Sequence, residues 1–306
     1  MRRLYGIVFS VIVLVGSLHV SAQTGLPPVE PQQLSGNISA AGSIALVGMT
    51  QQLSVNFGLD GFLGLTDVQP SDTTSALQSL CSGTLDIALA DRQITPDEVN
   101  LCNSNTITPL AFRIATDGIV VIVSQQNIFL NDLTTADLQR VYSTAINWEE
   151  INPDWVSNPI ARFGPATDSS TFQFFANAVF GGDTRAMITA LGARYGGSDD
   201  EIAANVASNP QAIGFMSSEA LTRNAGRIRT ITINGIIASQ GTIVSNSYDL
   251  SRPLFFYSSR EALQTRPEVA GFINYAITNS TDLATQVNLY PASTVSLQEA
   301  TTTWLN

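Results

Sequence analysis

One pattern recurs along this 306-residue chain: an apolar stretch, then a group of Ser, Thr or Asp residues, then a helical segment. It occurs at Ser43, at residues 71–73 and at residues 168–171, and Asp91-Arg92 ends a fourth apolar stretch. Strands that alternate with helices predict an α/β architecture. Ligands of open α/β sheets lie at the carboxyl ends of strands, where helix N-termini converge. These four places together therefore predict a binding site.

The densest of these groups lies in residues 164–175, GPATDSSTFQFF. Ser, Thr and Asp cap helix N-termini, but a cap needs only one such residue, and residues 168–171 offer four. Several hydroxyls and free backbone N–H groups at a helix start also describe an anion site. The pattern alone leaves both interpretations open. The following Phe172, Phe174 and Phe175 are expected to pack in the core.

The first 22 residues are expected to be a signal peptide that is removed on export. Arg2 and Arg3 precede an apolar run over residues 4–15, which is too short to span a membrane, and Val20-Ser21-Ala22 offers small residues for cleavage. Residues 23–35 contain three prolines and are expected to form a flexible lead-in. The mature protein is therefore expected to be periplasmic or secreted.

The charged residues exclude several classes of function. All 14 basic residues are Arg, and the single histidine, His19, lies in the expected leader. Without His or Lys in the mature chain, Ser-His-Asp, Cys-His and Ser-Lys catalysis are excluded. The sequence also contains no phosphate-loop or dinucleotide-binding motif. We therefore expect no enzymatic activity, no cofactor and no metal site.

The net charge bears on the partners of the mature chain. Its 12 Arg and 25 acidic residues give a formal charge of −13. Nucleic-acid binding needs basic patches, so this balance argues against it.

The two cysteines, Cys81 and Cys102, are expected to form a disulfide. In an exported chain a pair is more often a disulfide than a metal site. Closing a loop of about 20 residues stabilises a fold by roughly 3 kcal/mol in the chain-entropy model.

Local signals also predict individual elements. Thr95 is predicted to cap a helix, with Pro96 at its first position and Glu98 completing a capping box. The stretch TPLAFRIATDGIVVIVSQQN is predicted to hold two strands, the second over residues 118–124.

A series of motifs from about Ile38 to the C-terminus resembles the phosphate-binding receptors of Pst-type ABC transporters, a branch of the type II periplasmic binding proteins. The motifs are AGSIAL, SLCSGTLDIALADRQI, ATDGIVVIV, INWEEINPDW, RFGPATDSSTFQFF, QAIGFMSSEAL and DLSRPLFFYSSREAL. The resemblance implies two α/β lobes joined by two crossover strands, with an oxyanion held in the cleft. It places lobe 1 at residues 36–117 and 250–306, and lobe 2 at residues 118–249.

The resemblance also implies site residues, position by position. The family's S-G-T anchor falls on residues 169–171, its G-S-S-T on residues 42–45, its S-G-T-G on residues 71–74, and its A-S-R or A-S-D on residues 90–92. The implied ligand-binding residues are Ser43, Ser71, Thr73, Asp91, Arg92, Ser169, Ser170 and Thr171. Arg92 would supply the one formal positive charge of the site. Asp91 would accept the proton of monohydrogen phosphate and repel fully ionised sulfate.

Four positions depart from the family pattern. Ile44 and Ala45 lack the expected hydroxyls, and Ser170 replaces a glycine that would let an anion approach the backbone closely. Asp72 places a carboxylate where glycine is expected, and it would repel a dianion unless it faces away or is protonated.

These departures leave alternatives open. Ser43, Ser71 and Thr73 can each be ordinary caps, and Asp91-Arg92 can be a surface ion pair. A family member without a ligand, with a role in signalling or adhesion, and a receptor for sulfate or molybdate both stay possible. The prediction is an exported monomer that captures an oxyanion, phosphate first, and delivers it to the membrane permease of an ABC transporter.

Overall fold

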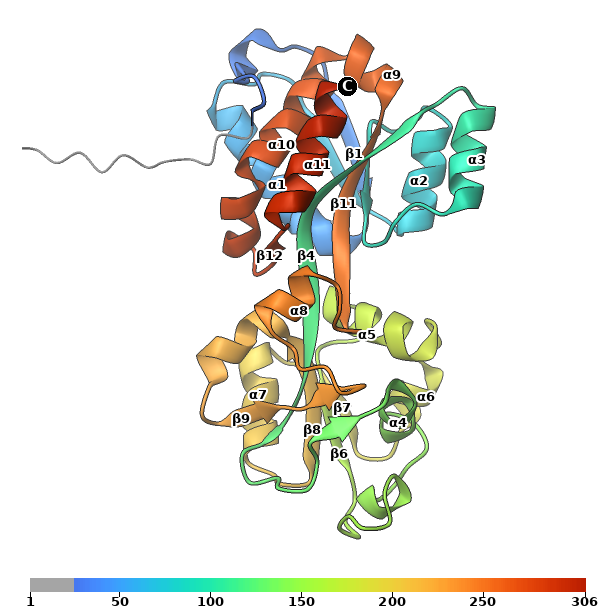
Figure 1. Cartoon of the computed structure of the whole chain (residues 1–306), viewed down its shortest axis with the longest axis vertical. Coiled ribbons are helices and arrows are strands. Elements are labelled where there is room, and N and C mark those ends of the chain that lie inside the picture. Colours follow the sequence, from blue (N-terminus) through green and yellow to red (C-terminus); the bar gives the residue numbers. More distant parts are fainter. Residues whose placement is uncertain (1–24) are drawn as a thin grey trace, which may run out of the picture.

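The computed structural model describes residues 25–306, so the expected signal peptide, residues 1–22, lies outside the described residues. The chain forms two α/β lobes connected by two long strands, β4 (Pro109–Ser124) and β11 (Ser251–Ser259) (Figure 1). Within residues 25–306, no helix is long and apolar enough to cross a membrane. The predicted α/β architecture with two lobes is confirmed.

Lobe 1 contains both the N-terminal part of the described chain and its C-terminus. Its strands are β1 (Ile38–Gly42), β2 (Thr66–Pro70), β3 (Ile87–Ala90) and β12 (Tyr290–Pro291). Its helices are η1 (Pro31–Gln33), α1 (Ile44–Leu59), α2 (Thr73–Cys81), α3 (Pro96–Ser104), α9 (Arg260–Thr265), α10 (Pro267–Gln286) and α11 (Thr294–Leu305). β1 pairs in parallel with both β2 and β3, so the carboxyl ends of these three strands lie at one edge of the sheet.

Lobe 2 is formed by the middle of the chain. Its strands are β5 (Asp132–Leu133), β6 (Ala161–Gly164), β7 (Ala193–Tyr195), β8 (Ala212–Ser217), β9 (Ile228–Thr230) and β10 (Thr232–Ile233). Its helices are α4 (Thr135–Val141), η2 (Trp148–Glu150), α5 (Ser170–Phe180), α6 (Arg185–Thr189), α7 (Asp199–Ala207), η3 (Ser218–Asn224) and α8 (Gln240–Val244). α5 begins at the end of lobe 2 that faces lobe 1 (Figure 1).

β4 is a single strand where two were predicted, because Asp117 and Gly118 continue the extended backbone between the two apolar halves. Its first half pairs antiparallel with β11 and its second half with β8. The sheet therefore runs through both lobes in the order β2-β1-β3-β11-β4-β8-β6-β7. A Cβ atom at Gly118 would lie 2.9 Å from the side chain of Ile243 in α8, so only glycine fits at this crossing point.

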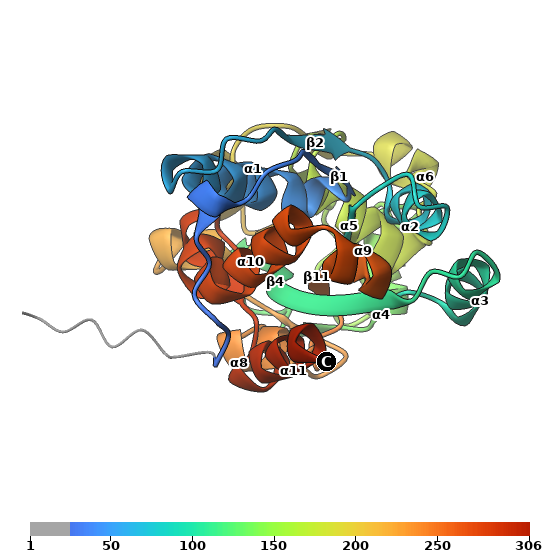
Figure 2. The same ribbon diagram turned by 90° about the horizontal axis from the view of Figure 1, so that it is seen from above.

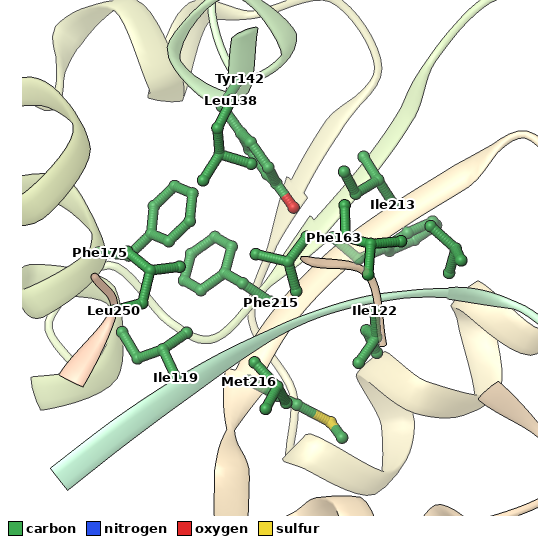
Figure 3. Packing of buried hydrophobic residues seen from close by; sticks show 14 of the residues in the cluster. Ile119, Ile122, Leu138, Tyr142, Phe163, Phe175, Ile213, Phe215, Met216 and Leu250 are labelled. Atoms are coloured by element: carbon green, nitrogen blue, oxygen red, sulfur yellow. The ribbon is translucent and has the colours of Figure 1, made fainter. Parts of the chain in front are cut away.

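The buried side chains form separate cores in the two lobes. In lobe 2 the rings of Phe175 and Phe215 stack at 4.0 Å, and Tyr142 packs edge-on against both (Figure 3). The buried members of this core lie within residues 119–250. The largest core cluster of lobe 1 draws its buried members from residues 38–115 and 254–300. The two cores therefore draw on separate parts of the chain, which change over between residues 115 and 119 and between residues 250 and 254.

The structure differs from the expected flexible lead-in. Pro31 is buried, and Leu26, Val29 and Leu34 pack against the core of lobe 1. The side chain of Asn274 in α10 also donates a hydrogen bond to the carbonyl of Pro27 (3.0 Å). The apolar residues before, between and after the prolines explain this packing, since they pack their side chains against lobe 1.

The predicted disulfide joins Cys81, the last residue of α2, to Cys102 in α3. α3 projects from the edge of lobe 1, away from α10 and α11 (Figures 1 and 2). The predicted capping box of α3 is confirmed, because Thr95 accepts from the backbone of Glu98 and Glu98 accepts from the backbone of Thr95. The disulfide therefore ties a helix with few buried residues to the body of lobe 1.

Candidate ligand-binding cleft

Three helix N-termini from the two lobes converge on one cavity of about 630 Å³. The first residues of α1 and α2 line it from lobe 1, and the first residue of α5 lines it from lobe 2. The leading N–H groups of a helix have no acceptor within the helix. Together with the helix dipole, they make such a convergence favourable for an anion.

The structure brings six of the eight implied site residues to this cavity. They are Ser43, Ser71, Thr73, Asp91, Arg92 and Ser170. Ser169 does not line it, because its hydroxyl accepts a hydrogen bond from the backbone N–H of Phe172 (3.1 Å) and caps α5. Thr171 instead lines a second cavity of about 320 Å³ between the lobes. The DSST group therefore contains both a cap, Ser169, and a residue that lines the cleft, Ser170.

Asp91 lies at the centre of the hydrogen bonds in the cavity. Its carboxylate accepts from the hydroxyl of Ser43 (2.9 Å) and from the hydroxyl of Thr73 (2.7 Å). It also accepts from Nη1 of Arg252 (2.9 Å). The hydroxyls of two predicted binding residues therefore donate to Asp91, so an entering anion has to share donors with this carboxylate.

Arg252 also lines the cavity, although the sequence analysis did not identify it as a site residue. It is the second residue of β11, lies directly opposite Asp117 on β4, and has a side chain that is only 6% exposed. Its Nε and Nη2 donate to Oδ2 of Asp117 (3.0 and 2.8 Å), and Nη2 also donates to the hydroxyl of Ser170 (2.6 Å). The signal in the sequence is a charged residue directly before the apolar run PLFFY.

The structure differs from the expectation that Arg92 provides the one positive charge of the site. Arg92 lines the rim of the cavity, but its Nη1 and Nη2 donate to the two carboxylate oxygens of Glu98 (2.9 and 2.7 Å). Nη2 also donates to the hydroxyl of Thr74 (2.9 Å). The hydrogen bond from Arg92, with further bonds from Thr95, lowers the pKa of Glu98 to about 2. Arg92 thus holds α3 through Glu98, while Arg252 is the cation inside the cavity.

The carboxylate of Asp72 is turned toward its own helix. It accepts from the backbone N–H of Ser75 (2.9 Å) and from the hydroxyl of Ser75 (2.6 Å), and so caps α2. These bonds lower the pKa of Asp72, so it is ionised at neutral pH. The repulsion that the sequence suggested is reduced, because the oxygens of this carboxylate are directed to α2.

Ile44 and Ala45, the two positions that lack the expected hydroxyls, both lie at the start of α1. Ile44 is half exposed and lines both cavities, so it lies where the two cavities meet. The backbone N–H of Ala45 donates to the hydroxyl of Ser43 (3.4 Å), which caps α1. Ser43 therefore acts as a cap and as a donor to Asp91 at the same time.

Two α/β lobes on two crossover strands, with helix N-termini and hydroxyls in the cleft between them, define the two-lobed type II periplasmic-binding-protein fold. The chain belongs to the PBP superfamily, whose domain profile matches residues 28–280.

Relatives and solved structures agree with this membership. Protein SphX of Synechocystis is 29% identical over 279 residues, which cover 87% of this chain and 82% of the relative. The phosphate-binding protein PstS of Staphylococcus aureus is 26% identical over 250 residues, which cover 80% of this chain and 75% of the relative. The crystal structure of a possible phosphate binding protein from Planctomyces limnophilus is 25% identical, has a TM-score of 0.82, and is matched over 89% of this chain and 98% of that one. The resemblance to Pst-type phosphate-binding receptors is confirmed.

Proposed function

We propose that this chain is an exported phosphate receptor that captures the anion between its lobes and delivers it to the permease of an ABC transporter. The observation that carries the proposal is the convergence of three helix N-termini and Arg252 on one interlobe cavity. The relatives named for phosphate binding support the choice of phosphate among the oxyanions.

The charges around the cavity favour an anion that carries a proton. One guanidinium, Arg252, is paired with two carboxylates, Asp91 and Asp117, so this group has a formal charge of −1 before any anion enters. A hydroxyl has one proton to donate. If Ser43 or Thr73 turns its proton to the anion, Asp91 is left with a free acceptor position. The O–H of monohydrogen phosphate fills that position, whereas sulfate has no proton to offer.

Capture needs no chemical step. The two lobes are connected through β4 and β11, and closure about these strands would bring α1 and α2 of lobe 1 and α5 of lobe 2 onto the same anion. We therefore propose a monomeric binding protein without enzymatic activity, acting outside the cytoplasm after removal of residues 1–22.

Calorimetric titration of residues 23–306 with phosphate, sulfate and molybdate tests the proposal. We expect phosphate to bind about 100-fold more tightly than sulfate, since a lost charge-assisted hydrogen bond and the repulsion from Asp91 together amount to about 3 kcal/mol. The D91N variant should lose most of this discrimination. Binding of sulfate or molybdate in preference to phosphate would identify a different oxyanion receptor. No binding of any of the three would leave the ligand-free role as the explanation.

A further inference from the structure

Arg252 moves with lobe 1 through two fixed contacts. It lies opposite Asp117 in the pairing of β11 with β4. β11 also pairs with β3, the strand that ends just before Asp91, so the contact between Arg252 and Asp91 is made within one sheet. Rotation of lobe 2 about the connecting strands therefore leaves these two ion pairs in place.

The contacts of Arg252 with lobe 2 are of a different kind. Nη2 donates to the hydroxyl of Ser170, and the guanidinium carbon lies 4.4 Å from the centre of the Phe174 ring. Ser170 and Phe174 are four residues apart in α5, so they share one face of the helix. These contacts are made only by side chains, whereas strand pairing holds Arg252 to lobe 1. They therefore last only while lobe 2 lies against Arg252.

All three phenylalanines of this stretch belong to the buried core of lobe 2, as expected, but Phe174 also reaches the cavity. Phe172 and Phe175 are completely buried within lobe 2, whereas Phe174 is 8% exposed and lines the cavity. The aromatic face of Phe174 attracts a cation, and the attraction increases where the cation is shielded from water, as the Arg252 side chain is.

The guanidinium keeps one donor for an anion. Of its five N–H groups, four make the hydrogen bonds to Asp117, Asp91 and Ser170. The fifth belongs to Nη1 and has no acceptor among residues 25–306. An anion that accepts from this N–H and from the N-terminus of α5 is held by both lobes at once.

We propose that Arg252 couples anion capture to closure of the lobes, and that Phe174 is the positioning residue through which lobe 2 holds Arg252. The proposal rests on the proposed function for the identity of the anion. An anion bound to Arg252 and α5 favours the closed arrangement, and the closed arrangement in turn places the Phe174 ring over the cation. By linkage, any change that weakens the contact between Phe174 and Arg252 weakens anion binding.

The variant F174L tests this, because leucine keeps an apolar side chain and removes the aromatic face. We expect its phosphate affinity to fall roughly 5- to 20-fold, and its radius of gyration without phosphate, measured by small-angle X-ray scattering, to increase. The variant F174Y keeps the aromatic face and should bind within about twofold of the natural protein. The matched control is F175L, the same substitution one residue along in the core of lobe 2, which should lower the melting temperature and leave affinity unchanged.

Two results would overturn the proposal. The first is an F174L variant with natural affinity and an unchanged radius of gyration. The second is an equal loss of affinity in F174L and F175L, which would show that Phe174 acts by packing alone. If the natural protein binds no phosphate, the proposed function fails, but the comparison of F174L with F174Y by scattering in the absence of phosphate still decides whether this contact closes the lobes.

Discussion

Replacement of Arg252 by glutamine distinguishes the role of Arg252 from that of Arg92, the other arginine of the cleft. R252Q removes the cation between Asp91 and Asp117, whose side chains are 25% and 12% exposed. Removing one partner of a buried ion pair costs about 3–5 kcal/mol. Asp91 keeps its bonds from Ser43 and Thr73, so we expect a loss of unfolding free energy near the lower limit, about 3 kcal/mol.

The same variant should bind phosphate weakly. A hydrogen bond to a charged group contributes about 1.5–3 kcal/mol, which corresponds to a roughly 10- to 150-fold loss of affinity. The two unpaired carboxylates left in the cavity also repel the anion, so the larger value is expected. R252K is the second variant: it keeps the charge and loses the bidentate geometry, and should fold well with intermediate affinity.

The matched control is R92Q. The Arg92 side chain is 36% exposed and its pair with Glu98 lies at the rim of the cavity, so we expect a stability loss of about 1 kcal/mol or less and affinity within about threefold. Calorimetric titration with phosphate and urea unfolding without phosphate measure both quantities. The reasoning is refuted if R92Q loses tenfold or more in affinity while folded R252Q or R252K binds like the natural protein.

Three further perturbations test other parts of the structure. Hydrogen bonding from Arg92 lowers the pKa of Glu98 from 4.5 to about 2, so Glu98 stabilises the fold above about pH 4.5 and loses this effect as the pH falls toward 2. Between pH 6 and pH 2.5, the unfolding free energy measured with urea should therefore fall less in E98Q than in the natural protein. An equal fall in both proteins would contradict the ion pair. Reduction of the bond between Cys81 and Cys102 should lower the unfolding free energy by about 3 kcal/mol, and two alkylatable thiols in native, non-reduced protein would rule the disulfide out. S169A removes the cap of α5 and should cost about 1 kcal/mol of stability with phosphate affinity within about twofold; a large affinity loss at unchanged stability would place the Ser169 hydroxyl on the ligand instead.

The parts of the fold that follow from local patterns could be predicted from the sequence. The capping box at Thr95, the alternation of strands and helices, and the polar groups at strand ends all depend on neighbouring residues. The directions in which consecutive side chains point could be predicted less well. Ser169 is the extended N-cap of α5, and Ser170 and Thr171 lie about 100° apart around the helix, so the three hydroxyls point in different directions.

The identity of the cation was beyond local reasoning for a related physical reason. Arg92 follows Asp91 directly in the bend after β3, but its guanidinium donates to Glu98 and Thr74 and not to Asp91. Asp91 instead meets Arg252, which lies 161 residues further along the chain. Only the pairing of β3, β11 and β4 brings Asp91, Asp117 and Arg252 together.

The bond between Cys81 and Cys102 leaves the chain without a reactive thiol, and the sequence contains no lysine. Amine-reactive dyes therefore have no side chain to label, and the α-amino group is their single target. A single lysine introduced at the rim of the cleft, for example by N177K in α5, would be the one side-chain amine in the protein. A fluorophore attached there would report lobe closure by its emission, which makes this fold a convenient scaffold for an optical anion sensor that needs no cysteine chemistry.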